Sequence, residues 1–281
     1  MYAIEIKNVN KSFGDFAIRN LNLILPSGCI LGLVGENGAG KSTTIKMIMN
    51  ALSPDSGTIS ILGTDNQSDA FTKLKNEIGV VLDESYFPDV LNPQNVNAVM
   101  KNIYQNWDEK LYFSYLQTFN LPKEKIFKEF SRGMKMKLSI AVALSHHPKL
   151  LVLDEATSGL DPFVRDEILD VFNEFTRDET HSVLISSHIV SDLEKICDYI
   201  AFLHNGSLLF CEEKDRLLEE YAILRLPRDT FASIPASAIK GKKQTDYDVT
   251  ALVKKNALPS GIPTEKTTIE EIILFLAKGD K

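Results

Sequence analysis

The chain has 281 residues, of which 44% are hydrophobic, so it can bury the core of one large domain together with a smaller appendage. Its formal net charge of −7 argues against a nucleic-acid-binding protein, which usually carries a basic excess or a basic stripe. Cys29, Cys197 and Cys211 form no CxxC pair, which disfavours a disulfide framework or a zinc site and predicts buried, inert thiols.

Two features of the sequence predict a cytosolic chain. No uninterrupted apolar run approaches the ~18 residues that a membrane-spanning helix needs. The N-terminal residues MYAIEIKNVN alternate apolar and polar side chains, which is typical of a strand rather than a signal peptide. One local basic cluster departs from the acidic balance and consists of Lys123, Lys125, Lys128, Arg132, Lys135 and Lys137.

Strand-like and helix-like segments alternate along residues 1–210. The sequence predicts strands over 2–7, 21–25, 30–34, 58–62, 78–82, 149–153, 182–186, 199–204 and 207–211. It predicts helices over 41–51, 67–76, 131–146, 162–177 and 189–196. The segments 150–153 and 182–185 are almost wholly apolar, as in parallel strands that are covered on both faces. This pattern predicts an α/β core.

Two regions differ from this alternation. Residues 85–127 are predicted to form a mostly helical inserted subdomain, because aromatic residues recur there at helical spacing: Tyr86, Phe87, Tyr104, Trp107, Tyr112, Phe113, Tyr115 and Phe119. After Tyr221, prolines separate short strand-like pieces. The final TTIEEIILFLAKG predicts a helix with a capping box, from Thr267 to Glu270 or from Thr268 to Glu271.

The stretch GENGAGKS, residues 35–42, matches the pattern GxxxxGK[ST] between a predicted strand and a predicted helix. Glycines let such a loop curl and direct backbone N–H groups at phosphate oxygens, and the helix N-terminus adds a positive dipole. Lys41 would contact the β- and γ-phosphates, and the Ser42 hydroxyl would bind Mg²⁺. The expected nucleotide contacts are Gly35, Asn37, Gly38, Ala39, Gly40, Lys41, Ser42 and Thr43. The motif alone leaves a kinase, a GTPase and a transporter ATPase open.

Two carboxylates follow the buried strand Leu150–Leu153. Asp154 is expected to hold Mg²⁺, as acidic residues do in P-loop enzymes. Glu155 could take a proton from an attacking water. An acidic pair after a strand also occurs as an ordinary helix cap, but the phosphate-binding loop favours the catalytic interpretation.

With the segment FSRGM at residues 130–134, the motif set resembles an ATP-binding cassette (ABC) transporter ATPase over residues 1 to about 215. The family signature is LSGGQ, and FSRGM is similar to variants in the branch that drives separate ABC-2-type membrane subunits. The resemblance implies an α/β P-loop NTPase fold of the ABC ATPase type, with an antiparallel β subdomain and a helical subdomain at about 85–147. It leaves residues 216–281 as a small C-terminal α+β accessory domain.

The resemblance also implies a head-to-tail dimer, with an identical or a different second cassette. Ser131 and Gly133 would contact the γ-phosphate that the opposite subunit holds, although Ser131 also fits a simple helix N-cap. The segment Ser158–Asp161 resembles the loop that runs along the dimer interface, and Asp161 before Pro162 also fits an N-cap.

Two further residues match the family at positions that also have structural interpretations. Phe13 matches the aromatic residue that stacks on adenine, where the family more often has Tyr, but a lone Phe after a strand is usually a core residue. His188 matches the switch histidine that hydrogen-bonds the γ-phosphate, whereas a lone His at a strand end is more often structural. The segment Ser186-Ser187-His188 favours the functional interpretation.

One residue departs from the family pattern. The strand that enters the helical subdomain usually ends in Gln, but IGVVLDES places Asp83 there and Glu84 next to it. A carboxylate can also bind Mg²⁺, yet it is shorter than Gln and adds negative charge near the γ-phosphate. The hypothesis is that Asp83 retains the coupling role.

The resemblance implies an ATP- and Mg²⁺-dependent ATPase that drives export through a separate ABC-2-type membrane permease, possible cargoes being peptides or antimicrobial compounds. Such a chain would lie on the cytoplasmic face of the membrane and dock through the aromatic-rich region 85–127. A soluble ATPase that remodels ribosomes or nucleic-acid complexes is the alternative, although such factors usually carry two cassettes in one chain. A chromosome-organising ATPase needs a long coiled-coil insertion, for which the ~90 residues between Ser42 and Ser131 leave no room.

Overall fold

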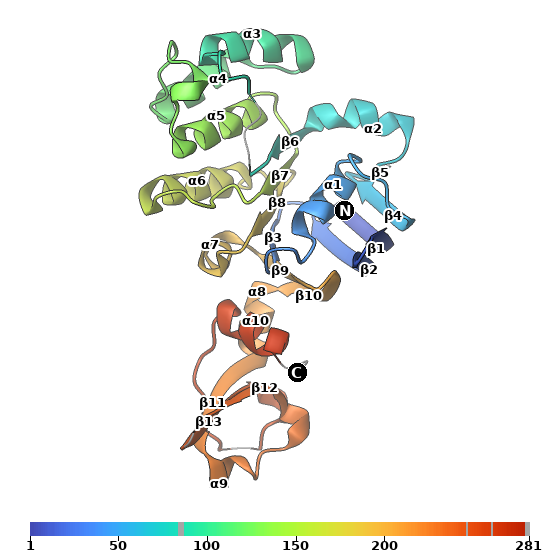
Figure 1. Cartoon of the computed structure of the whole chain (residues 1–281), viewed down its shortest axis with the longest axis vertical. Helices are drawn as coiled ribbons and strands as arrows, with labels where there is room; N and C mark the ends of the chain where they lie inside the picture. Colours follow the sequence, from blue (N-terminus) through green and yellow to red (C-terminus); the bar gives the residue numbers. More distant parts are fainter. Residues whose placement is uncertain (84–86, 246, 260, 279–281) are drawn as a thin grey trace.

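The computed structural model describes residues 1–83, 87–245, 247–259 and 261–278 (Figure 1). Glu84 and Tyr86, which the sequence singled out, lie outside the described residues. A six-stranded sheet forms the centre, in the order β10 (Ser207–Glu213), β9 (Tyr199–His204), β3 (Ile30–Val34), β8 (Ser182–Ser187), β7 (Leu150–Asp154) and β6 (Ile78–Val81). Neighbouring strands from β9 to β6 pair in parallel, and β10 pairs antiparallel at the edge. The predicted α/β core is confirmed.

A four-stranded antiparallel sheet lies beside the nucleotide loop (Figure 1) and has the order β2 (Phe16–Pro26), β1 (Tyr2–Phe13), β4 (Ser56–Ile61) and β5 (Thr64–Asp65). The first two strands are longer than predicted because a tight turn at Gly14-Asp15 joins them into one hairpin, with Phe13 opposite Phe16. The hairpin matters for the site, because it brings the start of β2 toward the nucleotide loop.

Each of the five predicted helices is present. They are α1 (Lys41–Ile48), α2 (Asp69–Leu74) with the 3₁₀ turn Lys75–Glu77, α5 (Arg132–Leu144), α6 (Pro162–Phe175) and α7 (Val190–Ile196). Helix α1 ends three residues earlier than predicted, because Asn50 adopts a left-handed conformation (φ 51°) and the N–H of Ala51 donates to the carbonyl of Lys46.

The aromatic-rich region is helical, as predicted, and contains α3 (Pro93–Ile103), α4 (Glu109–Thr118) and the 3₁₀ turn Phe127–Glu129. Figure 1 shows α3, α4 and α5 gathered at one end of the molecule. Most of the aromatic residues pack against one another there: Tyr112 and Phe127 are fully buried, and Trp107 contacts Tyr112. The extent of a separate helical subdomain, 85–147, stays a prediction.

The C-terminal segment contains α8 (Lys214–Glu220), β11 (Tyr221–Pro227), α9 (Arg228–Phe231), the turn Ala236–Ala238, β12 (Ile239–Gln244), β13 (Asp248–Lys254), the turn Lys255–Ala257 and α10 (Ile269–Lys278). Its antiparallel sheet has the order β11-β13-β12. Thr268 and Glu271 exchange backbone-to-side-chain hydrogen bonds at the start of α10, which confirms the second of the two predicted capping boxes.

Helix α10 ties this segment to the central domain. Ile269, Ile272 and Ile273 of α10 belong to the same buried cluster as Leu193 and Ile196 of α7. Figure 1 shows α10 beside α8, on the side of the segment that faces α7. The boundary at residue 215 therefore stays a prediction, because one continuous core crosses it.

Cys197 is buried, whereas Cys29 and Cys211 are only half-buried, and the three thiols are free. Burial is the main cause that raises the pKa of each thiol, which favours the unreactive protonated form. Among the described residues, no helix combines the length and the apolar character that crossing a membrane would require.

Candidate functional site

The loop between β3 and α1 adopts backbone conformations that glycine alone accommodates easily. Gly38 and Gly40 have φ angles of 84° and 111°, and a Cβ atom at Gly40 would come within 2.4 Å of Ile18. The loop folds over Lys41, whose ammonium donates to the carbonyl of Gly35 at 2.7 Å and to that of Glu36 at 3.4 Å. The predicted strand–loop–helix context of the motif is thus present.

A pocket of about 610 Å³ opens beside this loop. Its lining residues come from β2, the loop, α1 and the ends of three central strands, and they are Phe16, Glu36, Asn37, Gly38, Gly40, Lys41, Ser42, Thr43, Asp83, Glu155, Ser158 and His188. The chain therefore brings most of the predicted site residues together. Ala39 is buried beneath the loop, where its carbonyl accepts from the N–H of Gly206.

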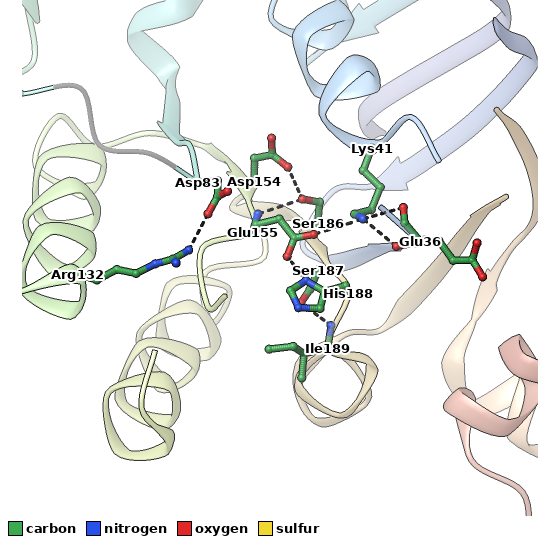
Figure 2. Close-up of polar contacts among 11 residues, drawn as sticks. Glu36, Lys41, Asp83, Arg132, Asp154, Glu155, Ser186, Ser187, His188 and Ile189 are labelled. Carbon is green, nitrogen blue, oxygen red and sulfur yellow. Dashed lines mark hydrogen bonds and ion pairs between the residues drawn. The ribbon is translucent and has the colours of Figure 1, made fainter. Parts of the chain in front are cut away.

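Glu155 lies between two groups that can respond to a nucleotide (Figure 2). One carboxylate oxygen is 3.3 Å from the ammonium of Lys41, and the other is 2.7 Å from Nδ1 of His188. The Glu155 side chain is only 12% exposed, whereas that of His188 is 47% exposed. A shielded carboxylate that contacts an imidazole and a lysine ammonium is suited to general-base chemistry.

Ser186, on β8, orders both carboxylates at the end of β7 (Figure 2). Its hydroxyl donates to Asp154 at 2.5 Å, and the N–H of Glu155 donates to the Ser186 hydroxyl and carbonyl, each at 3.1 Å. These bonds hold Glu155 in a left-handed conformation (φ 51°), which a residue with a side chain adopts only when its surroundings impose it. Sequence reasoning did not identify Ser186 as a site residue, although its place two residues before His188 was a usable signal.

The pocket and the adjacent end of β7 supply oxygen atoms that could bind Mg²⁺. Ser42 and Asp83 line the pocket, and Asp154 is a buried carboxylate (7% exposed) at the end of the adjacent strand. Hydroxyl and carboxylate oxygens are the hard ligands that this cation prefers. The Asp154 carboxylate accepts from the Ser186 hydroxyl, and a cation would provide further compensation for its buried charge.

Besides Gly35, Ala39 and Asp154, four predicted site residues do not line this pocket. Ser131 caps α5 by accepting from the N–H of Met134, and Asp161 caps α6 by accepting from the N–H of Val164. Gly133 lies in the first turn of α5. Phe13 is 41% exposed, with the Lys11 ammonium 5.6 Å from its ring centroid. The roles of these residues toward a nucleotide stay predictions.

Phe16 lines the site and Arg132 contacts one of its residues, but sequence reasoning assigned neither of them to it. Phe16 lines the pocket because the Gly14-Asp15 turn folds β2 back, and this turn signal was present in the sequence. The Arg132 guanidinium pairs with Asp83 at 2.9 Å (Figure 2). No sequence signal links these two residues, which are 49 positions apart.

Comparison with known proteins agrees with this geometry. The family model described as ABC transporter matches residues 18–158. The bacitracin transport ATP-binding protein of Enterococcus faecalis is 32% identical over 88% of this chain and 75% of its own length. A lantibiotic transport ATP-binding protein of Streptococcus pyogenes is 34% identical over 75% of this chain and 91% of its own length.

Solved structures share the fold. An ATP-binding subunit of an ABC transporter superposes with a TM-score of 0.69 at 27% identity, covering 76% of this chain and 91% of that one. A dimeric bacterial ABC transporter cassette superposes with a TM-score of 0.67 at 23% identity, covering 75% of this chain and 98% of that one. This second likeness supports the fold alone. The chain belongs to the ABC transporter family, as an ATP-binding subunit with the ABC ATPase fold that hydrolyses ATP.

Proposed function

We propose that this chain is the ATPase subunit of an exporter, which acts with Mg²⁺ and a separate ABC-2-type membrane permease at the cytoplasmic face of the membrane. The export role is supported by the relatives named for bacitracin and lantibiotic transport. A peptide or antimicrobial cargo is the class that these names favour. The observation that carries the catalytic part is the position of Glu155, between Lys41 and His188.

The proposed mechanism begins with competition for Lys41. Its ammonium contacts the carbonyls of the loop and the carboxylate of Glu155. Triphosphate oxygens carry more negative charge, so they would draw the ammonium away and leave the Glu155 carboxylate free to accept a proton from water. His188 would then exchange its hydrogen bond with Glu155 for one with the γ-phosphate. Ser42, Asp154 and Asp83 would hold Mg²⁺, which when bound offsets phosphate charge.

A second cassette would complete each site. Ser131 and Gly133 lie outside the pocket of their own chain, at the N-terminus of the thirteen-residue helix α5. Backbone N–H groups at a helix N-terminus favour an anion. We infer that they serve the γ-phosphate of the opposite chain, so that ATP joins two cassettes and hydrolysis separates them. The γ-phosphate thus supplies the contacts that distinguish the closed dimer from the open one.

The permease is proposed to dock at an apolar groove. This groove, of about 500 Å³, lies between β6, α3 and α5 and is lined by Leu82, Phe87, Val99, Met100 and Tyr104, among others. Leu82 lines the groove while the next residue, Asp83, lines the nucleotide pocket. A helix seated in the groove would therefore adjoin the residue that faces the nucleotide, which supports a role in coupling.

Purification of the tagged chain from gently solubilised membranes tests the transporter function. We expect a polytopic membrane protein to accompany the wild type and to be lost from a Val99→Glu variant, because a charge in the groove would oppose an apolar helix. Leu209→Glu, at a similarly exposed position on the edge strand β10, is the matched control and should retain the partner. Ribosomal proteins or nucleic acid without any membrane protein would instead support the soluble remodelling factor.

A further inference from the structure

Asp83 and Arg132 form an ion pair at the rim of the nucleotide pocket. Nη2 of Arg132 lies 2.9 Å from Oδ1 of Asp83, and both side chains are about half exposed. Asp83 follows β6 and lines the pocket, whereas Arg132 is the first residue of α5. Figure 2 shows the guanidinium directed toward Asp83, on the opposite side of Glu155 from Lys41.

A third segment holds the same guanidinium. A Cβ atom built on Gly159 would lie only 2.7 Å from Nη1 of Arg132, so Arg132 packs directly against this glycine. Gly159 follows Ser158, which lines the pocket. Arg132 thus contacts two segments that contribute walls to the nucleotide site, although its own side chain does not line it.

The charges around the pocket show why a partner for Asp83 matters. Among the described lining residues, the carboxylates are Glu36, Asp83 and Glu155, and the ammonium group is that of Lys41, which Glu155 already contacts. A triphosphate adds further negative charge. An uncompensated carboxylate at Asp83 would repel the phosphates, most strongly the one closest to it.

We propose that Arg132 is a positioning residue for ATP in its own chain. It neutralises Asp83 and holds that carboxylate at the rim, and so permits a carboxylate where the family usually has glutamine. The position of Arg132 in the signature LSGGQ is a glycine, so two of the departures from the family pattern, Asp83 and Arg132, are in contact with each other. The inference rests on the proposed function in one respect, namely that Asp83 faces the γ-phosphate. Arg132 therefore raises the affinity for ATP more than the affinity for ADP.

The test is a direct binding titration with fluorescent mant-ATP and mant-ADP at low ionic strength, run in EDTA so that Asp83 has no Mg²⁺ to hold, with a wild-type titration in Mg²⁺ as the reference. We expect Arg132→Ala to weaken mant-ATP binding roughly two- to five-fold, the range for an exposed ion pair, and mant-ADP binding less. Adding Asp83→Asn should restore the affinity for mant-ATP, because the charge that needs compensation is gone. Arg132→Lys should retain most of the wild-type affinity, and the effect should shrink in high salt.

Arg216→Ala is the matched control. Arg216 is also exposed and pairs with a carboxylate, Glu212, at 2.9 Å, but neither residue lines the pocket, so both affinities should stay unchanged. The inference would be overturned if Arg132→Ala weakened the binding of both nucleotides equally. It would also be overturned if adding Asp83→Asn did not restore the affinity for mant-ATP. A wild-type chain that binds neither nucleotide would instead overturn the proposed function, and the inference with it.

Discussion

At the residue scale, one buried hydroxyl orders two neighbouring carboxylates. Ser186 donates to Asp154 and accepts from the N–H of Glu155, so its position fixes the direction in which both acidic side chains leave β7. The parallel pairing of β7 with β8 places Asp154 opposite Ser186. The catalytic geometry therefore depends on a side chain that need not touch the nucleotide.

Ser186→Ala tests this dependence. We expect kcat for ATP hydrolysis to fall roughly ten- to a hundred-fold, because misplaced carboxylates lose about 1–3 kcal/mol of transition-state stabilisation. Ser182→Ala is the control, since Ser182 is equally buried on the same strand and its hydroxyl accepts from the N–H of Gly28, away from the pocket. Equal losses of activity in the two variants would show that Ser186 acts only through stability.

The site residues that the sequence predicts and those that it misses differ in a physical way. Lys41, Glu155 and His188 were predictable because each occupies a fixed distance from a strand end within a recognisable motif. Arg132 was not assigned to the site, because its contact with Asp83 depends on how α5 packs beside β6, which local spacing does not specify. Phe16 was missed because the two strands that form its hairpin were predicted too short, as 2–7 and 21–25, and the turn between them was not predicted.

At the scale of elements, two ion pairs connect α6 with α7, the helix that follows His188. Arg165 pairs with Asp192 at 3.6 Å, and this carboxylate is only 7% exposed. Arg165 also donates to the carbonyl of Leu160, just before α6. The second pair, Lys195 with Asp166, is exposed on both sides. The first pair thus connects the segment before α6 to the helix after the switch histidine.

Breaking the two pairs should have unequal effects. Asp192→Ala leaves Arg165 partly buried without its carboxylate, and we expect the free energy of unfolding to fall by about 2–4 kcal/mol. Asp166→Ala breaks an exposed pair between the same helices and should cost less than about 1 kcal/mol. Urea unfolding curves measure both values. Equal costs would mean that the partly buried pair contributes no more than the surface pair.

Periodicity predicted the bounds of the elements well where the strands are continuously apolar, and less well elsewhere. Strands β3 and β9 begin and end at the predicted residues. After residue 213 the sequence indicated only strand-like pieces and one helix, because short antiparallel strands such as β12, with its run of lysines, carry no clear alternation. The core formed between α7 and α10 joins segments about 75 residues apart, and no local pattern could predict it.

At the scale of the whole molecule, the C-terminal segment and the nucleotide-binding part share one core through α10. Ile272 of this helix is fully buried in the cluster that also contains Leu193 of α7. Trp107, the single tryptophan of the chain, lies between α3 and α4 in the sequence. Figure 1 shows these two helices at the end of the molecule that is distant from α10. The fluorescence of Trp107 therefore reports whether a destabilising substitution in α10 also lowers the stability of the part that contains α3 and α4.

Ile272→Ala should lower the unfolding midpoint that Trp107 reports, because removing a buried side chain costs about 2–5 kcal/mol. Leu274→Ala changes a half-exposed residue of the same helix and should have an effect of about 0.5 kcal/mol or less. If the Trp107 transition stayed at the wild-type midpoint in Ile272→Ala, the C-terminal segment would have to unfold independently.

Glu155 is proposed to activate water in a site that two cassettes close over ATP. The most direct measurement is ATP turnover of Glu155→Gln, together with its molar mass by light scattering in ATP and in ADP, with Mg²⁺ present. Glutamine keeps the size of the side chain but cannot accept the proton, so we expect ATP binding, almost no hydrolysis, and a dimer that persists in ATP and not in ADP. Hydrolysis at the wild-type rate would show that Glu155 is not the general base.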